Sequence, residues 1–337
     1  MCSDFVGSKG ASVKHREVDV VIPVYNGARF LAEAVRSAAE QTLPPARILI
    51  CDDGSTDDTP LIAQRLAADI ANVEHLRLPH GGESAARNGG ITASTAPYIA
   101  FLDADDVWMP RKLEAQMAVF ASANENVGIV HSAYEHIDER GAIIEGEWVF
   151  QPRLKGDIFR QILLENYVVS GSASSVVVKR NVLDKAGRFD ERLFYGADRD
   201  MWIRLAAFAH FDYAPEPLVR IRVHGNSVQR FKAKERAIDF YLQRVLMLSK
   251  WENIVLSEPE VCAELRRRAL LLLLPRIREP KRIDAFYKAL HAQGSVLARS
   301  LFPSRGDLWL SLLQTLGRYG AWRLRRHILN ERRPFLE

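Results

Sequence analysis

Three aspartates directly follow an apolar segment of the sequence. Residues 98–102 read YIAFL, and Asp103, Asp105 and Asp106 come immediately after them. Carboxylate oxygens suit hard divalent cations, and Mg²⁺ is usually held by one or two carboxylates together with substrate phosphates. Aspartate is also a good helix N-cap, so the same residues suit a capped turn before a helix over residues 110–121. The cluster alone therefore predicts either a metal–phosphate site or a capped turn.

Polar residues also follow two earlier apolar segments. These are Tyr25-Asn26 after residues 18–24, and Asp52-Asp53 after residues 48–51. Strand patterns alternate with helix patterns as far as residue 122, which predicts a parallel sheet with helices on both faces. The carboxyl ends of parallel strands share one edge of the sheet, so these polar groups should converge there. Convergence of three polar strand ends favours the metal–phosphate site over the capped turn.

Four motifs in this order and spacing resemble the family 2 glycosyltransferases. They read VVIPVYNGARFL, ICDDGSTDDT, GGESAARNGGI and APYIAFLDADDVWMPRKLE, and the resemblance covers about residues 18–225. Members of this family are inverting enzymes with a nucleotide-sugar-binding α/β fold called GT-A. The resemblance therefore implies a GT-A fold, a Rossmann-like mixed sheet with flanking helices, followed by a C-terminal α-helical region.

We expect three parts along the chain. Residues 1–16 are polar and predict a disordered leader, residues 17–228 a GT-A catalytic domain, and residues 229–337 a basic α-helical region. Within the catalytic domain, residues 17–122 would form the nucleotide-sugar-binding half and residues 123–228 the acceptor half, in which the pattern predicts strands over residues 172–179, 211–214 and 218–223. In the basic region it predicts helices over residues 235–251, 258–275, 281–301 and 308–329.

The resemblance implies roles for residues of the donor half. Tyr25 would stack on the base next to the backbone of Pro23, and Asp53 would accept the uracil N3–H, with Asp52 as the nearby alternative or a ribose contact. Arg87 would face the phosphates, although a surface salt bridge on its helix is an alternative. The nucleotide-sugar-binding set is Pro23, Val24, Tyr25, Asn26, Asp52, Asp53, Arg87, Asp103 and Ala104.

The resemblance also implies Mn²⁺ or Mg²⁺ as the cofactor. Asp105 would be the main metal ligand, and Asp103 would lie nearer the ribose or sugar hydroxyls, with a lesser claim to the metal. His224, in VRIRVHGNS, matches a histidine that reaches the metal or the diphosphate in many relatives. Asp106 would cap the next helix or contact the metal through water.

Asp198 is the implied catalytic base on the acceptor side. It would remove a proton from the acceptor hydroxyl, although N-capping its helix is an alternative reading. The preceding position usually carries Glu in the family but is Ala197 here, and Asp200 is a rival base that we expect to pair with a neighbouring Arg instead. Trp108, Ser172 and Ala197 are expected on the acceptor side, whereas Trp202 and Leu205 are expected in the core.

Charge is unevenly divided along the chain. Residues 1–230 carry 25 Lys and Arg against 31 Asp and Glu, a net of −6, whereas residues 231–337 carry 21 against 11, a net of +10. Basic residues flank apolar faces in this last third, which predicts either peripheral membrane contact or a helical bundle that buries its Leu faces. No nucleic-acid motif accompanies the charge. The three cysteines lack metal or disulfide spacing, no apolar run approaches a membrane span, and we expect a cytoplasmic protein.

The leading hypothesis is a metal-dependent, inverting hexosyltransferase-type enzyme. It would move one sugar from a nucleotide sugar, with a UDP-sugar as the favoured donor, to a hydroxyl of a glycan or lipid-linked glycan. The reaction would serve cell-surface polysaccharide or glycoconjugate synthesis. One alternative is a non-catalytic carbohydrate-binding scaffold, which Ala197 keeps open. Another is a sugar nucleotidyltransferase, although that class carries a GxGTR-type loop where this chain reads PVYNG.

Overall fold

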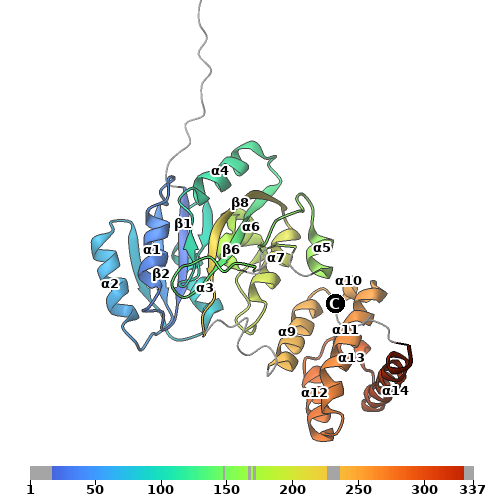
Figure 1. Cartoon of the computed structure of the whole chain (residues 1–337). Helices are drawn as coiled ribbons and strands as arrows, with labels where there is room; N and C mark the ends of the chain where they lie inside the picture. The colour runs from blue at the N-terminus through green and yellow to red at the C-terminus, as the bar shows by residue number, and fades with distance from the viewer. Residues whose placement is uncertain (1–16, 147–148, 166–167, 170–171, 226–235, 330–337) are drawn as a thin grey trace, which may run out of the picture. The chain divides into compact units, whose positions relative to one another are not determined.

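The computed structural model describes residues 17–146, 149–165, 168–169, 172–225 and 236–329, with side chains of the last helix described as far as Arg318. The chain divides into two compact units, residues 1–224 and residues 225–337 (Figure 1). The expected leader (residues 1–16) and the expected boundary between residues 228 and 229 lie outside the described residues.

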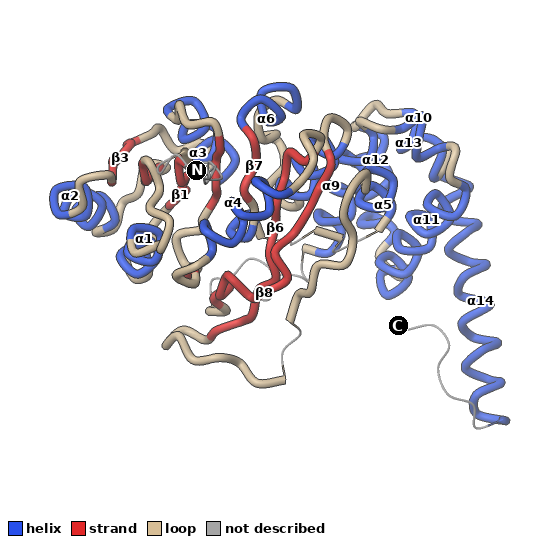
Figure 2. The backbone as a smooth tube through the Cα atoms, turned by 90° about the horizontal axis from the view of Figure 1, so that it is seen from above, coloured by secondary structure: helices blue, strands red, loops and turns tan. Residues whose placement is uncertain are grey.

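An eight-stranded mixed sheet forms the centre of the first unit, in the order β3-β2-β1-β4-β7-β6-β8-β5 (Figure 2). The strands are β1 (Val18–Val24), β2 (Arg47–Asp52), β3 (Val73–Arg77), β4 (Tyr98–Phe101), β5 (Val107–Trp108), β6 (Val127–Ile137), β7 (Val177–Lys179) and β8 (His210–Arg222). Strands β3, β2, β1 and β4 run parallel to one another. Strand β7 is antiparallel to both β4 and β6, and β6 is parallel to β8. Strands β1, β2, β4, β6 and β8 therefore all end at one edge of the sheet.

The described residues of this unit form seven α-helices. They are α1 (Leu31–Ala39), α2 (Thr59–Asp69), α3 (Glu83–Ala93), α4 (Lys112–Ser122), α5 (Phe159–Leu164), α6 (Arg180–Ala186) and α7 (Ala197–Ala206) among the described residues. The helices cover the sheet, so every residue of β1 is buried. This explains why its sequence is nearly all apolar, as expected for a parallel strand with both faces covered.

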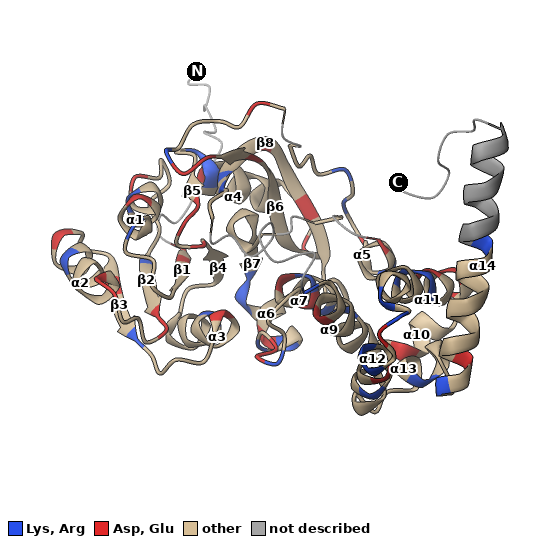
Figure 3. Cartoon of the chain, turned by 60° about the horizontal axis from the view of Figure 1, so that its bottom comes forward, with Lys and Arg blue, Asp and Glu red and all other residues tan. Residues whose placement is uncertain are grey.

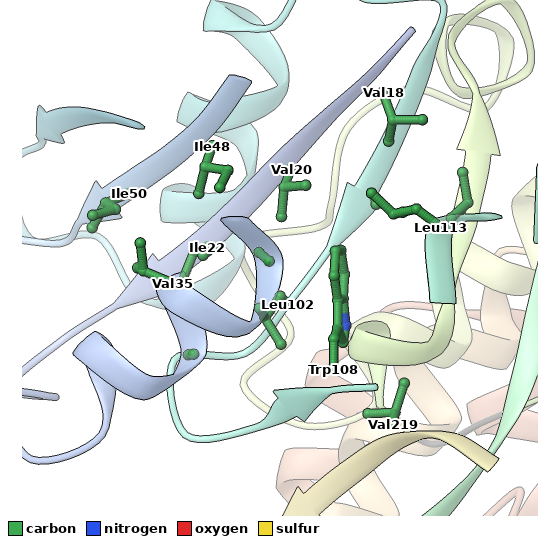
Figure 4. Close-up of a cluster of buried hydrophobic side chains, with 14 of the residues drawn as sticks. Val18, Val20, Ile22, Val35, Ile48, Ile50, Leu102, Trp108, Leu113 and Val219 are labelled. Carbon is green, nitrogen blue, oxygen red and sulfur yellow. The ribbon is translucent and has the colours of Figure 1, made fainter. Parts of the chain in front are cut away.

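The hydrophobic core joins the two halves of the first unit. Figure 4 shows Val20 and Ile22 of β1 and Leu102 after β4 in one cluster with Trp108 of β5 and Val219 of β8. All five side chains are at most 2% exposed. The loop that carries the aspartates after Leu102 is therefore fixed between the early strands and β8 by core packing on both sides.

Two strand predictions in the acceptor half were wrong in detail. The strand expected over residues 172–179 is reduced to β7, because a 3-10 helix (Ala173–Ser175) precedes it and Ser172 accepts a hydrogen bond from the Ser174 amide. The two strands expected over residues 211–214 and 218–223 are the single strand β8. Register irregularities opposite Ser132–Tyr134 let β8 continue past Pro217 while it stays paired with β6.

The second unit is helical, as predicted. Its helices are α9 (Ala237–Ser249), α10 (Glu252–Leu256), α11 (Pro259–Leu273), α12 (Pro280–Ala292), α13 (Val296–Leu301) and α14 (Arg305–Leu329), with a short 3-10 helix (Leu274–Arg276). One helix was expected over residues 281–301, but Gly294 has φ +71 and separates α12 from α13. Lys and Arg residues recur along this unit (Figure 3). In the described part of the chain, each helix is too short or too polar to cross a bilayer.

Candidate functional site

The turns after β1 and β2 are tied together by Asn26. Its backbone amide donates to Ser55 Oγ at 3.0 Å, and its side-chain Oδ1 accepts from the Thr56 backbone amide at 2.8 Å. Asn26 has φ +50, a left-handed conformation that Asn tolerates better than most residues. The side chain of Asn26 therefore holds two strand ends in register, which gives it a structural task beside the nucleotide contact implied by the family.

The two aspartates after β2 have different surroundings. Asp52 is fully buried, and its Oδ1 accepts from the Ser55 amide at 2.8 Å. Asp53 accepts one amide on each carboxylate oxygen, from Gly81 at 2.8 Å and Gly82 at 2.9 Å. These bonds orient the Asp53 carboxylate toward the glycine-rich loop before α3. Of the two, Asp53 is therefore the one held at the glycine-rich loop, and Asp52 shapes the turn.

Tyr25 presents an exposed ring beside this carboxylate. The residue is 49% exposed, and its ring stacks on the His80 imidazole with centroids 4.3 Å apart and an angle of 27° between the planes. Pro23 and Val24 are buried, and the Val24 carbonyl accepts the Asp53 amide at 2.9 Å. An aromatic face and an oriented carboxylate thus lie side by side, which is the combination that a planar base with a ring N–H requires.

Arg87 of α3 lies among three carboxylates. Its guanidinium donates to Glu83 at 2.5 Å, Asp103 at 2.7 Å and Asp198 at 2.9 Å, although Asp198 is 111 residues away. The residue is 2% exposed. The salt bridge on α3 that was the alternative is present, because Glu83 lies one turn before Arg87 and is 61% exposed, but the guanidinium itself is buried rather than on the surface. Burial lowers the pKa of Arg87, but the three carboxylates raise it and prevail, so the guanidinium stays charged.

Asp198 lies in the first turn of α7. The N-cap is Gly196, with φ +74 and no side-chain cap, so the reading of Asp198 as N-cap is wrong. Burial raises the pKa of Asp198 to about 6, because it outweighs the opposing effect of Arg87 and is reinforced by Asp103. A carboxylate with a pKa in this range is well matched to accept a proton near neutral pH.

The expectations for the rest of α7 were correct. Asp200 is fully buried and accepts from Arg204 at 2.9 Å, which is the pairing with a neighbouring Arg that was predicted. Trp202 and Leu205 are core residues, at 1% and 0% exposure. These contacts fix α7 in place and so fix the position of Asp198 at its start.

The carboxylates after β4 point to different partners. Asp103 accepts from Arg87 on Oδ1 and from Ser172 Oγ on Oδ2 at 3.2 Å. The Asp105 side chain is 37% exposed, and its Oδ2 lies 2.9 Å from Nε2 of His224. Asp103 therefore links the donor half to the loop at Ser172, while Asp105 and His224 form an accessible carboxylate–imidazole pair.

Asp106 has a structural role that the sequence did not indicate. It is 3% exposed and accepts from Ser174 Oγ at 2.6 Å and from the Arg222 amide at 3.0 Å. Burial raises the pKa of Asp106 well above its usual value, and the neighbouring Asp105 and Asp103 add to this. Helix α4 begins at Lys112 with Arg111 as its N-cap, so the capping role expected for Asp106 is wrong.

The residues expected on the acceptor side are not equally accessible. Trp108 is 2% exposed, its Nε1 donates to the Ser174 carbonyl at 2.8 Å, and Lys112 Nζ lies 3.9 Å from its ring centroid. The expectation that Trp108 lines the acceptor side is therefore wrong, because its ring is part of the core. Ser172 is 5% exposed, whereas Ala104 and Ala197 are partly exposed.

Asp105 and His224 supply two donors that fit a divalent cation. Within the described ranges, no group of three or more His, Cys, Asp or Glu side chains could by itself hold a metal. A cation at this pair would take its remaining ligands from substrate oxygens and water, which is the usual mode of Mg²⁺ binding at phosphate-processing sites. The pair therefore fits an ion that arrives with, or is completed by, a diphosphate.

Three residues of this region were missed in reading the sequence. His80 stacks on Tyr25, Glu83 pairs with Arg87, and Arg222 donates from Nε to the Asp105 carbonyl at 2.9 Å and from Nη2 to Glu33 at 2.7 Å. Arg222 is two residues before His224 at a strand end, where alternate residues share a face. That spacing was a signal that Arg222 also belongs to this edge. Glu83 lies four residues before Arg87 on α3, which is the spacing of a helical ion pair, whereas nothing local marked His80.

A mixed sheet with flanking helices and polar strand ends at one edge defines a GT-A fold. The family described as Glycosyl transferase family 2 matches residues 19–186, and the chain belongs to it. Among its relatives is an uncharacterized glycosyltransferase of Rickettsia prowazekii, 31% identical over 213 residues. The match covers 62% of this chain and 64% of that protein, so the chain spans less than two thirds of its relative.

Two crystal structures of Staphylococcus aureus TarS share the fold. TarS residues 1–349 in complex with UDP align with a TM-score of 0.52 at 17% identity, over 85% of this chain and 90% of that one. The same segment in complex with UDP-GlcNAc aligns with a TM-score of 0.53 at 16% identity, over the same shares of the two chains. At these identities the likeness establishes the fold alone.

Proposed function

We propose that this family 2 glycosyltransferase transfers a sugar from a UDP-sugar to a hydroxyl group of a glycan or lipid-linked glycan, with inversion at the anomeric carbon. The observation that carries the proposal is the bridge made by Arg87, which bonds both Asp103 after β4 and Asp198 at the start of α7. The bridge puts a carboxylate suited to take a proton next to Asp103, in the loop that also carries the proposed metal ligand Asp105. Transfer by direct displacement needs both groups in one site.

The nucleoside end of the donor is assigned to Tyr25 and Asp53. The Tyr25 ring supplies a stacking face, and Asp53 accepts a ring N–H of the kind that uracil carries at N3. UDP and UDP-GlcNAc are the ligands in the two TarS structures, which supports a UDP-linked donor by analogy of fold. Thymine and guanine also carry a ring N–H, so nucleotides with these bases belong in the first screen.

Asp105 and His224 would hold Mn²⁺ or Mg²⁺. When bound, the cation supplies charge to the diphosphate that leaves with the nucleoside. Arg87 keeps its positive charge between Asp103 and Asp198, so it adds a fixed cationic group whose field would favour a diphosphate nearby. Asp103, bonded to both Arg87 and Ser172, keeps the two loops at their present spacing.

Asp198 is assigned as the general base. Its carboxylate would accept the proton of the acceptor hydroxyl, whose oxygen then attacks the anomeric carbon on the face opposite the leaving diphosphate. The raised pKa, about 6, supports this assignment, because a stronger base in its ionised form removes the proton more readily. The same observation disfavours a non-catalytic scaffold, for which Ala197 in place of Glu was the argument.

A donor screen tests this proposal. The protein is incubated with UDP-, TDP- and GDP-sugars with Mn²⁺ and a glycan or lipid-linked acceptor, and released nucleoside diphosphate is measured. We expect release with UDP-sugars that depends on Asp198, and no release from the Asp198→Asn variant above a hundredth of the wild-type rate. Failure of every nucleotide sugar to be transferred or hydrolysed would favour the scaffold.

We also propose that the second unit brings the enzyme to an anionic membrane surface, where a lipid-linked acceptor would lie. Leu310, Leu313 and Leu316 of α14 are 57%, 56% and 42% exposed, and residues 231–337 carry a net charge of +10. Exposed leucines on a helix of a basic region have the character of an interfacial membrane contact.

A further inference from the structure

The imidazole of His80 makes the contacts that the proposed function assigns to a nucleobase. It stacks on Tyr25 with ring centroids 4.3 Å apart. Its Nδ1 lies 2.9 Å from Asp53 Oδ2 and 3.0 Å from the Asp53 carbonyl oxygen. Both neighbours of Nδ1 are acceptors, so Nδ1 carries the proton and donates. His80 therefore presents a flat ring with a ring N–H to the same two residues that a uracil would use.

The imidazole and a base cannot share the covered face of Tyr25 and Oδ2 of Asp53 at the same time. Only one ring can lie on the Tyr25 face that His80 covers. Asp53 already accepts the Gly81 and Gly82 amides, one on each oxygen, and a carboxylate accepts about four hydrogen bonds in all. The N–H of His80 therefore takes acceptor capacity on Oδ2 that a base N–H would need.

The His80 ring can leave without dismantling the site. Its side chain is 58% exposed, so it can turn into solvent. The backbone after it stays attached to Asp53 through the Gly81 and Gly82 amides. Gly82 has φ +91, which few other residues adopt, so the loop keeps this shape independently of the ring.

We propose that His80 closes the base subsite of the free protein with its own side chain, and that the base of a nucleotide enters by displacing it. This inference rests on the proposed function, because it takes Tyr25 and Asp53 as the base subsite. The apparent dissociation constant then equals the intrinsic constant divided by the fraction of molecules in which the ring has left. Every nucleotide bears this same cost, whatever its base.

The test is calorimetric binding of UDP, CDP and pyrophosphate, with Mn²⁺ present, to the wild type and to His80→Ala. One hydrogen bond and one ring stack favour the closed form by roughly tenfold, so His80→Ala should bind both UDP and CDP about tenfold more tightly. Pyrophosphate has no base, and its affinity should not change. His80→Ser serves as a second variant if His80→Ala unfolds at a lower temperature.

His210→Ala is the matched control, because His210 begins β8 at the opposite edge of the sheet from the strand ends. It should bind UDP as the wild type does. Weaker UDP binding by His80→Ala would overturn the proposal and make the ring a wall that contacts the bound base, and unchanged UDP binding would overturn it as well. If neither the wild type nor any variant binds UDP, the proposed donor class is wrong. If the wild type and His80→Ala bind UDP equally well, only this inference is wrong.

Discussion

Arg87 Nη1 donates to Asp198 Oδ1 at 2.9 Å, which joins α3 to the start of α7. The same guanidinium bonds Asp103 through Nη2. A change at Asp198 is therefore felt by the carboxylates after β4, and experiments on this residue must separate loss of a base from loss of an ion pair.

Replacement of Asp198 by Asn should lower the rate of sugar transfer by about 10²- to 10⁴-fold, because positioned proton acceptors contribute in this range. Asn keeps the size of the side chain and can still accept from Arg87, so UDP binding should change much less than the rate. The two quantities are measured by release of UDP under saturating donor and by calorimetry. Asp184→Asn, an exposed substitution on α6, should match the wild type in both.

The pH dependence of transfer should have an acidic limb near pH 6. Burial raises the pKa of Asp198 to about 6, so kcat/KM should fall tenfold per pH unit below that value as the base becomes protonated. The sign for stability is the reverse. The folded carboxyl binds its proton more tightly than the unfolded one, so its contribution to the free energy of unfolding falls as pH rises from about 4 to about 6. An unchanged acidic limb in the residual activity of Asp198→Asn would assign the limb to another group.

Replacement of the proposed metal ligands, Asp105 and His224, should make UDP binding independent of Mn²⁺. In the wild type, UDP should raise the melting temperature more with Mn²⁺ than without it, because a ligand that binds the folded state stabilises it by mass action. Asp105→Ala should abolish the Mn²⁺-dependent part of this rise in melting temperature. His224→Ala should lower the apparent affinity for Mn²⁺ about 10- to 100-fold. Glu114→Ala, an exposed change on α4, is the control. If UDP raises the melting temperature of the wild type equally with and without Mn²⁺, the metal role of Asp105 is ruled out.

The early strands of the fold could be read closely from the sequence. Strand β1 was expected at residues 18–24 and is found there, and β2 and β4 differ by two residues or fewer from expectation. Parallel strands covered on both faces are nearly all apolar, so local sequence identifies them. Strand β8 was expected as two strands, because Pro217 reads as a break and only its pairing with β6 shows that the strand continues.

The candidate site was predictable by residue type and less so by contact. Resemblance, together with strand-end position for Asp105 and His224, named Asp105, Asp198 and His224 as candidates, and their roles stay predictions. The partners of Asp106 were not predictable, because Ser174 and Arg222 lie 68 and 116 residues further on and carry no local signal. Arg87 was expected near phosphate. Its pairing with Glu83 on the same helix follows from their spacing, but Asp103 and Asp198 lie 16 and 111 residues further on and carry no local signal.

Asp106 should stabilise the fold through its hydrogen bonds, and its negative charge should not be needed for this. Asp106→Ala leaves the Ser174 hydroxyl and the Arg222 amide without this acceptor, at about 1–3 kcal/mol for each group. We therefore expect a loss of about 2–4 kcal/mol in the free energy of unfolding, measured in urea. Since burial raises the pKa of Asp106 well above its usual value, a neutral side chain should substitute well, and Asp106→Asn should cost less than half as much. Equal losses for Ala and Asn would mean that the ionised carboxylate is needed.

The exposed leucines of α14 should bind membranes that carry negative charge. The wild type should sediment with vesicles of phosphatidylglycerol and phosphatidylcholine at low salt, and less with phosphatidylcholine alone, because the +10 charge of residues 231–337 attracts anionic lipid. Leu310→Glu combined with Leu313→Glu removes two side chains that are 57% and 56% exposed, and the bound fraction should fall at least tenfold, since burial of each Leu is worth about 1.5–3 kcal/mol. Leu271→Glu, at a Leu of α11 that is 38% exposed, is the matched control and should retain binding. Equal loss in both variants would assign the effect to added negative charge, and no sedimentation of the wild type would remove the membrane proposal while leaving the assignments at Asp105 and Asp198 intact.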